Sequence, residues 1–263
     1  MGAFIMIAVD VGNTSLHFAW GKDNKIIKTV QLSTHKATIK AIGKIICRYP
    51  NEEIFVCSVV PAITELFKKL GHKVNIIGRD ITVPVRCLYN KKKVGMDRLV
   101  GAFAAKVLYP HVRIIIDFGT AITFDVLSKS GDYEGGLILP GVGSTLKVLS
   151  VCALLPKKIV MKKTKRLVPR DTSESISKGV EEGFSAMMNA LVKKYKKSLK
   201  LSDCDAIVIT GGDARYILPK IGFSYVYDPY LVIKGTFILS RRIPRGLAYS
   251  AEVASATKAG PRG

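Results

Sequence analysis

The sequence has few acidic residues: 20 Asp and Glu stand against 41 Lys and Arg, so the 263-residue chain carries a formal net charge of +21. Such an excess makes nucleic acids, anionic membranes and anionic small molecules the first partners to consider. The chain also lacks any apolar run near the ~20 residues that a membrane-spanning helix needs. The apolar segment 4–9 has no basic segment before it, so we predict neither a signal peptide nor a membrane partner.

Cysteine and histidine are also scarce. The five cysteines are an odd number without any C-x-x-C pair, and the four histidines are scattered along the chain. This excludes a disulfide framework or a zinc knuckle as the basis of the fold. The pattern indicates reduced thiols and a cytoplasmic protein.

What the chain does contain is an alternation of strand-like and helix-like patterns. Apolar, β-branched runs predict strands, and apolar residues at helical spacing predict the helices between them. The predicted strands are 5–9 (continued at 17–20 after a turn), 54–60, 113–116 and 206–210. The predicted helices cover 39–46, which Ser33 or Thr34 would cap, 99–107 and 180–195. With elements at this density, we expect an α/β fold with buried, largely parallel sheets.

A short segment occurs twice. I-A-V-D-V-G-N-T at 7–14 recurs as I-I-I-D-F-G-T-A at 114–121, so Asp10 matches Asp117 and Gly12 matches Gly119. A duplicated strand, Asp-x-Gly and turn halfway along the chain predicts two similarly built lobes. We place their boundary near Pro110, which divides the chain into lobes 1–110 and 111–245. Segment 246–263 has small residues and no periodic face, and we predict a disordered tail there.

Each copy of the repeat has the ingredients of a phosphate-binding turn. The glycine allows close approach of the backbone, whose N–H groups can bind phosphate oxygens together with the Asn or Thr side chains. The Asp at the strand end can hold a hard cation. A hairpin turn with a structural glycine is the alternative for either copy alone, but two such turns facing each other would form the phosphate clamp of a phosphotransferase. The sequence has no Walker-type loop and no G-x-G-x-x-G at a strand–helix junction, which argues against those nucleotide folds.

Three further segments allow a functional and a structural interpretation. V-G-M-D-R at 94–98 opens a helix, where Asp97 is either a residue favoured by the helix dipole or a base beside an anion-binding Arg98. G-G-L-I-L-P-G at 135–141 indicates closely packed backbone at a turn. T-G-G-D-A at 210–214 follows a buried strand and is either a plain strand–helix turn or a surface for adenine and ribose.

Taken in order, these five motifs resemble those of the type III pantothenate kinases, and the resemblance runs from Asp10 to about Ile243. S-V-V-P at 58–61 and L-V-I-K-G at 231–235 add to it. The family belongs to the acetate and sugar kinase, Hsp70 and actin superfamily. The resemblance therefore implies an α/β fold of the duplicated ribonuclease H-like, actin-like ATPase type, with mixed sheets in two lobes around a nucleotide cleft. It also implies that the chain phosphorylates pantothenate with ATP, giving 4′-phosphopantothenate in the first step toward coenzyme A.

The resemblance further implies roles for individual residues. Asp97 would be the general base on the pantothenate hydroxyl, Asp10 would lie near Mg²⁺, and Asp117 would hold a monovalent cation, K⁺ or NH₄⁺. The expected ATP-binding residues are Asp10, Val11, Gly12, Asn13, Thr14, Ser15, Leu16, His17, Thr120, Gly211 and Gly212. The expected acceptor-binding residues are Tyr89, Gly95, Met96, Asp97, Arg98 and Thr172. The family also implies a homodimer whose acceptor site is completed across the interface.

The excess of positive charge is local. Four stretches without acidic residues, 91–93, 157–170, 193–200 and 241–245, contain three, seven, five and three basic residues. The segments around the repeated turns and glycine motifs contain only Asp and Glu as charged residues, which suits cation-assisted phosphate binding better than a DNA-reading surface. A nucleic-acid-binding or regulatory protein on the same fold is therefore the secondary hypothesis, and a related small-molecule kinase acting on a sugar or a short carboxylic acid is the third.

Overall fold

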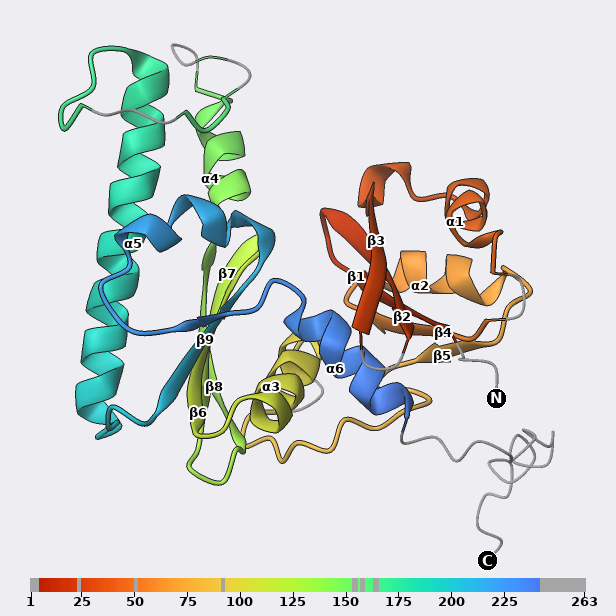
Figure 1. Ribbon diagram of the computed structural model, residues 1–263. Coiled ribbons are helices and arrows are strands. Elements are labelled where there is room, and N and C mark those ends of the chain that lie inside the picture. The colour runs from red at the N-terminus through yellow and green to blue at the C-terminus, as the bar shows by residue number, and fades with distance from the viewer. Residues whose placement is uncertain are drawn as a thin grey trace, which may run out of the picture.

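The computed structural model describes residues 5–22, 25–49, 52–90, 93–152, 156, 159–162 and 166–241. Two five-stranded sheets form its framework (Figure 1). The first sheet has the order β3-β2-β1-β4-β5 and consists of β1 (Met6–Val11), β2 (Ser15–Lys22), β3 (Lys25–Ser33), β4 (Ile54–Ser58) and β5 (Val74–Ile76). The second has the order β10-β9-β6-β7-β8 and consists of β6 (Val112–Phe118), β7 (Ala121–Leu127), β8 (Tyr133–Pro140), β9 (Ala206–Thr210) and β10 (Val226–Tyr227).

The two sheets share one topology. In each, three successive strands form an antiparallel meander, and two later strands are added in parallel on the other side of its first strand. This confirms the α/β fold with a duplicated unit and mixed sheets. The expectation of largely parallel sheets is wrong, because the strand after each Asp-x-Gly turn folds straight back as a hairpin.

Strands β1 and β4 of the first sheet are buried on both faces, which explains why they appear as continuous apolar runs, whereas the edge strand β3 is largely exposed. Alternate residues of β1, such as Ile7 and Val9, pack with α1 (Ile39–Ile46) and α2 (Pro61–Lys68). The other face, with Met6 and Ala8, packs with α3 (Met96–Leu108) and α6 (Leu231–Ser240). Asp10 continues the series of Met6 and Ala8, so alternation directs it toward the space between the sheets.

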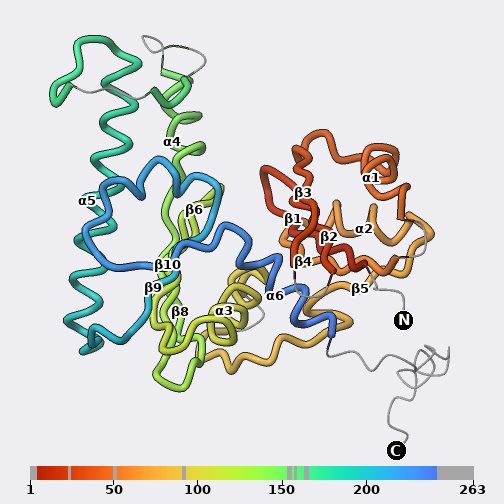
Figure 2. The backbone as a smooth tube through the Cα atoms, viewed as in Figure 1, coloured from red at the N-terminus to blue at the C-terminus, as the bar shows by residue number. Residues whose placement is uncertain are grey.

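The helices α3 and α6 lie between the two sheets (Figure 1). The chain passes from β10 through α6 toward the first sheet, so the last helix packs on β1 and β4 (Figure 2). Gly235 makes this packing possible, since a Cβ there would lie 2.8 Å from the Val100 carbonyl oxygen and 2.9 Å from the Ala104 Cβ. On the far face of the second sheet, α4 (Val142–Leu149) and the long α5 (Thr172–Ser198) supply Val142, Val180 and Met188 to the core.

Three local predictions need correction. Helix α1 is capped by Thr38, whose Oγ1 accepts a hydrogen bond from Ala41 N at 3.1 Å, because β3 and a 3-10 helix (η1, Thr34–Lys36) occupy the positions of Ser33 and Thr34. The segment 135–140 is part of strand β8 rather than a turn. The helix predicted over 180–195 begins earlier, since α5 starts at Thr172 with Asp171 as the N-cap.

Three predictions remain: the absence of a membrane span, the C-terminal tail and the boundary between the lobes. Among the described helices, none is long and apolar enough to cross a membrane. The predicted tail 246–263 lies outside the described residues. The division into lobes at residue 110 stays a prediction.

Candidate active site

A cavity of about 210 Å³ lies where the two repeated turns meet between the sheets. The first turn contributes Asp10, Gly12, Asn13, Ser15 and His17, and the second contributes Asp117, Gly119, Thr120, Ala121 and Thr123. Asp97 in the first turn of α3 and Thr210, Gly211 and Gly212 after β9 complete the polar lining. The two turns touch through the hydroxyls of Thr14 and Thr120, which are 2.7 Å apart. The facing arrangement predicted from the duplication is therefore present.

The first turn is held by its own backbone and by one neighbouring strand end. Gly12 N donates to the Ser15 carbonyl at 3.0 Å, and the Thr34 hydroxyl donates to the Gly12 carbonyl at 2.8 Å. The Ser15 hydroxyl and His17 Nε2 are 2.9 Å apart, and burial lowers the pKa of His17. The turn is thus a hairpin that also faces a cavity, so both interpretations apply to the same residues.

Val11 and Leu16, two predicted ATP-binding residues beside this turn, belong to the core of the first sheet. The side chains of Val11 and Leu16 are fully buried in the core of the first sheet. They lie on the face toward α1 and α2, away from the cavity. Any contact of these two residues with a ligand would have to come from their backbone atoms.

The second turn is tightly enclosed by other backbone. Gly141 N donates to the Thr120 carbonyl at 3.1 Å, and the Ser144 hydroxyl donates to the same oxygen at 2.6 Å. Gly211 has φ +90°, and a Cβ there would come within 2.5 Å of both the Phe118 carbonyl and Asp117 Oδ1. Only glycine fits such a position. The parallel pairing of Asp117 with Thr210 brings this glycine turn beside the second phosphate-type turn.

Three carboxylates share the cavity. Burial, with added repulsion from Asp97 and Asp117, raises the pKa of Asp10 to about 8. Burial, with repulsion from Asp97 and Asp125, raises the pKa of Asp117 to about 7. Burial also raises the pKa of Asp97, against the opposing effect of the Arg98 backbone N–H, which donates to Asp97 Oδ1 at 2.8 Å. No Lys or Arg lines this cavity in the part of the chain that the structure describes, so an anionic ligand needs cations to enter it.

The donor set fits a divalent cation that is shared with a ligand. Across the described ranges, no group of three or more His, Cys, Asp and Glu side chains is close enough to cage a metal alone. Mg²⁺ is commonly held by one or two carboxylates together with substrate phosphates. Asp10 offers such a carboxylate beside the first turn, and a cation there would relieve the repulsion that raises its pKa.

Arg98 is held by a buried carboxylate that the sequence interpretation missed. Its Nε and Nη2 donate to Asp125 Oδ1 at 2.9 and 2.6 Å. The Tyr133 hydroxyl donates to the same oxygen at 2.7 Å, and the Thr123 hydroxyl donates to Oδ2 at 3.0 Å. The sequence did contain a signal for Asp125. Thr123 and Asp125 are two residues apart on β7, so their side chains lie on one face of that strand, and Thr123 pairs with Asp117 of β6.

Comparison with known proteins identifies the chain's relatives. The sequence profile described as type III pantothenate kinase matches residues 6–194. A type III pantothenate kinase of Sulfurihydrogenibium sp. (strain YO3AOP1) is 35% identical, over 90% of this chain and 100% of that protein. One from Persephonella marina is 32% identical, over 89% of this chain and 97% of that protein. The chain belongs to the type III pantothenate kinase family.

Solved structures agree on the fold. A Campylobacter jejuni protein described as a Baf family transcriptional activator superposes with a TM-score of 0.60 at 21% identity, covering 90% of this chain and 98% of that one. A Sinorhizobium meliloti protein described as a 2-dehydro-3-deoxygalactonokinase gives 0.54 at 13% identity, covering 94% and 99%. Both likenesses concern the fold alone, and they show that the two-sheet arrangement of this member of the pantothenate kinase family also occurs in those proteins.

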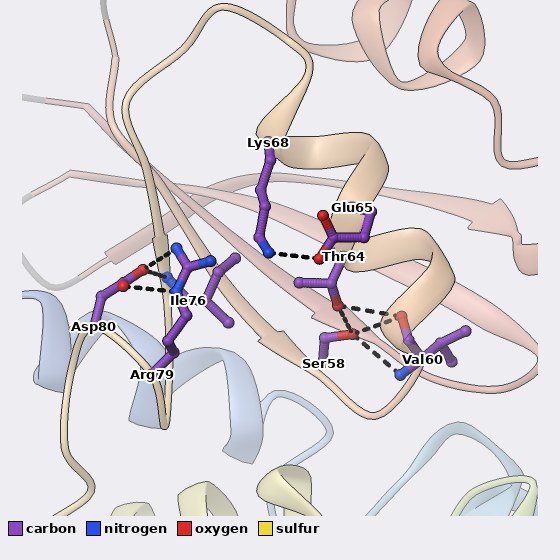
Figure 3. A network of polar contacts seen from close by, with 8 residues as sticks. All are labelled: Ser58, Val60, Thr64, Glu65, Lys68, Ile76, Arg79 and Asp80. Atoms are coloured by element: carbon purple, nitrogen blue, oxygen red, sulfur yellow. Dashed lines mark hydrogen bonds and ion pairs between the residues drawn. The ribbon is translucent and has the colours of Figure 1, made fainter. Parts of the chain in front are cut away.

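The acceptor residues expected from the family lie in several places. Gly95 and Met96 line a second groove of about 830 Å³, separated from the Asp97 cavity by Val59, which lines both. Ser58 and Thr64 also line this groove. Figure 3 shows their contacts: the Ser58 hydroxyl donates to the Val60 carbonyl at 3.3 Å and accepts from Val60 N at 3.1 Å and from the Thr64 hydroxyl at 2.7 Å.

Tyr89 and Thr172 line neither cavity. Tyr89 is half exposed, and its ring approaches Gly135 of β8, where a Cβ would lie 3.7 Å from the ring. Thr172 is exposed at the start of α5, in a shallow depression with Asp171 and Ser175. Figure 1 shows α4 and α5 extending beyond the second sheet. In a single chain, therefore, neither residue is part of the lining that Asp97 shares with the two turns.

The apolar wall of the cavity was missed by sequence interpretation. Its members are Val59, Pro229, Tyr230, Val232 and Ile233. Two weaker motifs of this kinase family, S-V-V-P and L-V-I-K-G, contain three of them. Because buried apolar residues occur throughout the chain, nothing in their own pattern separates cavity wall from core.

Proposed function

We propose that this chain phosphorylates the primary hydroxyl of pantothenate with ATP, the first step toward coenzyme A, and that Asp97 is the general base. One observation carries the proposal. Asp97, which belongs to neither copy of the repeat, lies in the same cavity as both phosphate-type turns and the glycine turn after β9. A carboxylate beside two phosphate-binding turns is the arrangement that in-line transfer to an alcohol requires.

The residues divide the work as follows. Backbone N–H groups and hydroxyls of the two turns hold the phosphates of ATP, and Gly211 and Gly212 leave room for adenosine. Asp97 accepts the hydroxyl proton while the alcohol oxygen bonds to the γ-phosphorus and the bond to the ADP oxygen breaks. Burial raises the pKa of Asp97, and a base with a pKa nearer the working pH transfers protons more effectively. Mg²⁺, when bound, supplies neutralisation of the phosphate charge.

We assign two different cations to the two Asp-x-Gly turns. Asp10 would hold Mg²⁺ with the phosphates, and Asp117 would hold K⁺ or NH₄⁺. In support, Asp117 lies against the enclosed backbone of Gly119 and Gly211, where oxygen-rich surroundings suit a larger monovalent cation.

A homodimer completes the proposal. Thr172 lies outside the Asp97 cavity, so it would have to act in the site of a second copy. Around the end of α4 and the segment before α5, four apolar side chains are largely exposed: Val148, Val151, Leu167 and Val168. Exposed apolar side chains that gather into one patch are typical of a protein–protein interface, and we propose that these four belong to one. Cytoplasmic location is proposed with it, supported by five free cysteines.

The nucleic-acid hypothesis is not favoured. The basic run 193–200 forms the exposed C-terminal end of α5, where Lys residues complement the helix dipole. Lys91 and Lys92 lie outside the described residues, and Lys93 lines the second groove.

The test is a product analysis. The protein is incubated with ATP, Mg²⁺, K⁺ and a panel of acceptors that includes pantothenate, sugars and short hydroxy acids, and products are identified by mass spectrometry. We expect 4′-phosphopantothenate as the main product. Phosphorylation of another acceptor with no reaction on pantothenate would reject the assigned substrate and favour the related small-molecule kinase.

A further inference from the structure

Asp125 is a buried carboxylate with an unusually complete set of donors. Its side chain is 4% exposed, and it accepts four hydrogen bonds, two from Arg98 and one each from Tyr133 and Thr123. The Arg98 guanidinium also lies 5.7 Å from the centre of the Tyr133 ring. Two charges this deeply buried are stable only when each satisfies the other.

This network reaches the proposed base through one residue. Arg98 follows Asp97 directly in the first turn of α3, and its backbone N–H donates to Asp97 Oδ1 at 2.8 Å. Its side chain ends on Asp125 in β7 of the second sheet. The start of α3 is therefore tied to the strand that carries Thr123, which itself lines the cavity.

The fold does not require a charge at this position. In the first sheet, Ala8 pairs with Ala19, and Ala19 is fully buried in an apolar cluster. In the second sheet the equivalent pair is Ile115 and Asp125. Since one copy of the same topology packs with alanine, the carboxylate in the other copy has a purpose beyond forming the sheet.

We propose that Asp125 is a positioning residue for phosphoryl transfer, which fixes the Arg98 guanidinium and, through Arg98, the Asp97 carboxylate relative to the phosphate-binding turns. This inference rests on the proposed function. Without the negative charge of Asp125, Arg98 has lost its partner and turns toward the other carboxylates of the cavity, Asp97 among them. The base is then misplaced, although ATP still reaches its turns.

Steady-state kinetics of Asp125→Asn separate this role from a structural one. We expect kcat to fall about 10- to 100-fold, the usual cost of misplacing a reacting group, while KM for ATP changes less than about twofold. The matched control is Asp205→Asn, which breaks another Arg–Asp ion pair, between Arg113 of β6 and Asp205 just before β9, at 3.9 Å. That control should keep its kcat.

The double variant Arg98→Lys/Asp125→Asn tests whether the two residues act as one unit. If they do, it is no slower than the slower single variant, because effects within one network are not additive. Unchanged kcat in Asp125→Asn, an equal loss in Asp205→Asn, or additive losses in the double variant would each overturn the proposal.

A second variant and a parallel measurement on the wild type complete the test. If Asp125→Asn does not fold, Tyr133→Phe removes one bond to the same oxygen: a severalfold lower kcat with unchanged KM for ATP supports the role, and unchanged kcat overturns it. Wild-type activity on pantothenate is measured in parallel. Inactive wild-type enzyme rejects the proposed function, whereas active wild type with a fully active Asp125→Asn rejects only the role of Asp125.

Discussion

The turn between β1 and β2 and the turn between β6 and β7 begin from the same sequence pattern and occupy the same place in the same topology. They differ in how they are held. The first is fixed by its own hairpin and by Thr34. The second is enclosed by the backbone at Gly141 and Gly211. Duplication thus kept the place of the two turns in the topology, while their closing hydrogen bonds diverged, since Gly12 N donates to the Ser15 carbonyl and Gly119 N to the Ala121 carbonyl. Their surroundings diverged as well, and we therefore expect the two turns to tolerate substitution differently.

The strands behind the turns differ in the same way. Ala19 in the first sheet joins the cluster that includes Phe237 of α6, whereas Asp125 in the second sheet binds Arg98 of α3. The first copy uses this position for close packing and the second uses it to anchor a charged group. Each prediction below tests a part of this asymmetry.

The largest effect is expected at Asp97, which belongs to neither turn. Asp97→Asn should lower kcat about 10²–10⁴-fold, the usual contribution of a general base, with the protein still folded. Coupled ADP assays and circular dichroism measure both properties. Asp203→Asn on the exposed loop before β9 is the matched control. An Asp97→Asn enzyme with normal activity contradicts the assignment of the base.

The next test compares the two turn carboxylates. Asp10→Asn should raise the Mg²⁺ concentration needed for half-maximal rate. The increase is about tenfold for each 1.4 kcal/mol of Mg²⁺ binding free energy that the carboxylate supplied. Asp117→Asn should mainly raise the K⁺ or NH₄⁺ requirement. Titrations of each cation at saturating ATP separate the two. If both variants respond alike to both cations, the turns have not diverged in the way proposed.

Alanine scanning of glycines tests the enclosure of the second turn. Gly141→Ala places a Cβ against the carbonyl oxygens of Gly119 and Thr120, so the free energy of unfolding should fall by about 1–3 kcal/mol. Gly12→Ala should cost less, because its nearest contact would be 3.3 Å from the Ser15 carbonyl. Gly43→Ala, with open space around it in α1, is the control for urea unfolding. Equal losses at Gly141 and Gly12 would remove the difference between the turns.

The last test concerns pH and leaves the sequence unchanged at first. The pKa values of Asp10, about 8, and Asp117, about 7, lie above the ordinary 3.8. At a pH between 3.8 and these raised values, the folded metal-free protein keeps protons that the unfolded chain has released. The free energy of unfolding therefore falls as pH rises from about 4 to about 8. The Tm should fall by about 2–4 °C for each kcal/mol that the free energy of unfolding loses. Asp10→Asn should flatten this slope, and a wild-type Tm that rises across this range would contradict the shifts.

The sequence predicted the parts of the fold whose local pattern matches their final surroundings. Both Asp-x-Gly turns and strand β9 were recognisable because a buried apolar strand followed by glycine marks where the strand ends. Asp97 was recognisable because it comes just before an apolar stripe at helical spacing. Strand β8 was not, because Gly135 and Gly136 imitate a turn. A Cβ at Gly136 would collide with the Phe124 backbone, and Gly135 has φ +121°, so close packing explains the first glycine and backbone conformation the second.

Other parts depend on contacts that no local pattern records. Helix α6 is apolar on nearly every side, since it lies between two sheets and has no solvent-facing stripe to produce helical periodicity. The partnership of Asp125 with Arg98 joins positions 27 residues apart. The place of Thr172 in an acceptor site depends, in our proposal, on a second copy of the chain.

The most direct test of the account is the initial rate of ADP release with and without pantothenate, in buffer containing Mg²⁺ and K⁺. The account predicts slow release without acceptor and a saturable increase with pantothenate, reduced when Na⁺ replaces K⁺. Release that pantothenate does not change would contradict it.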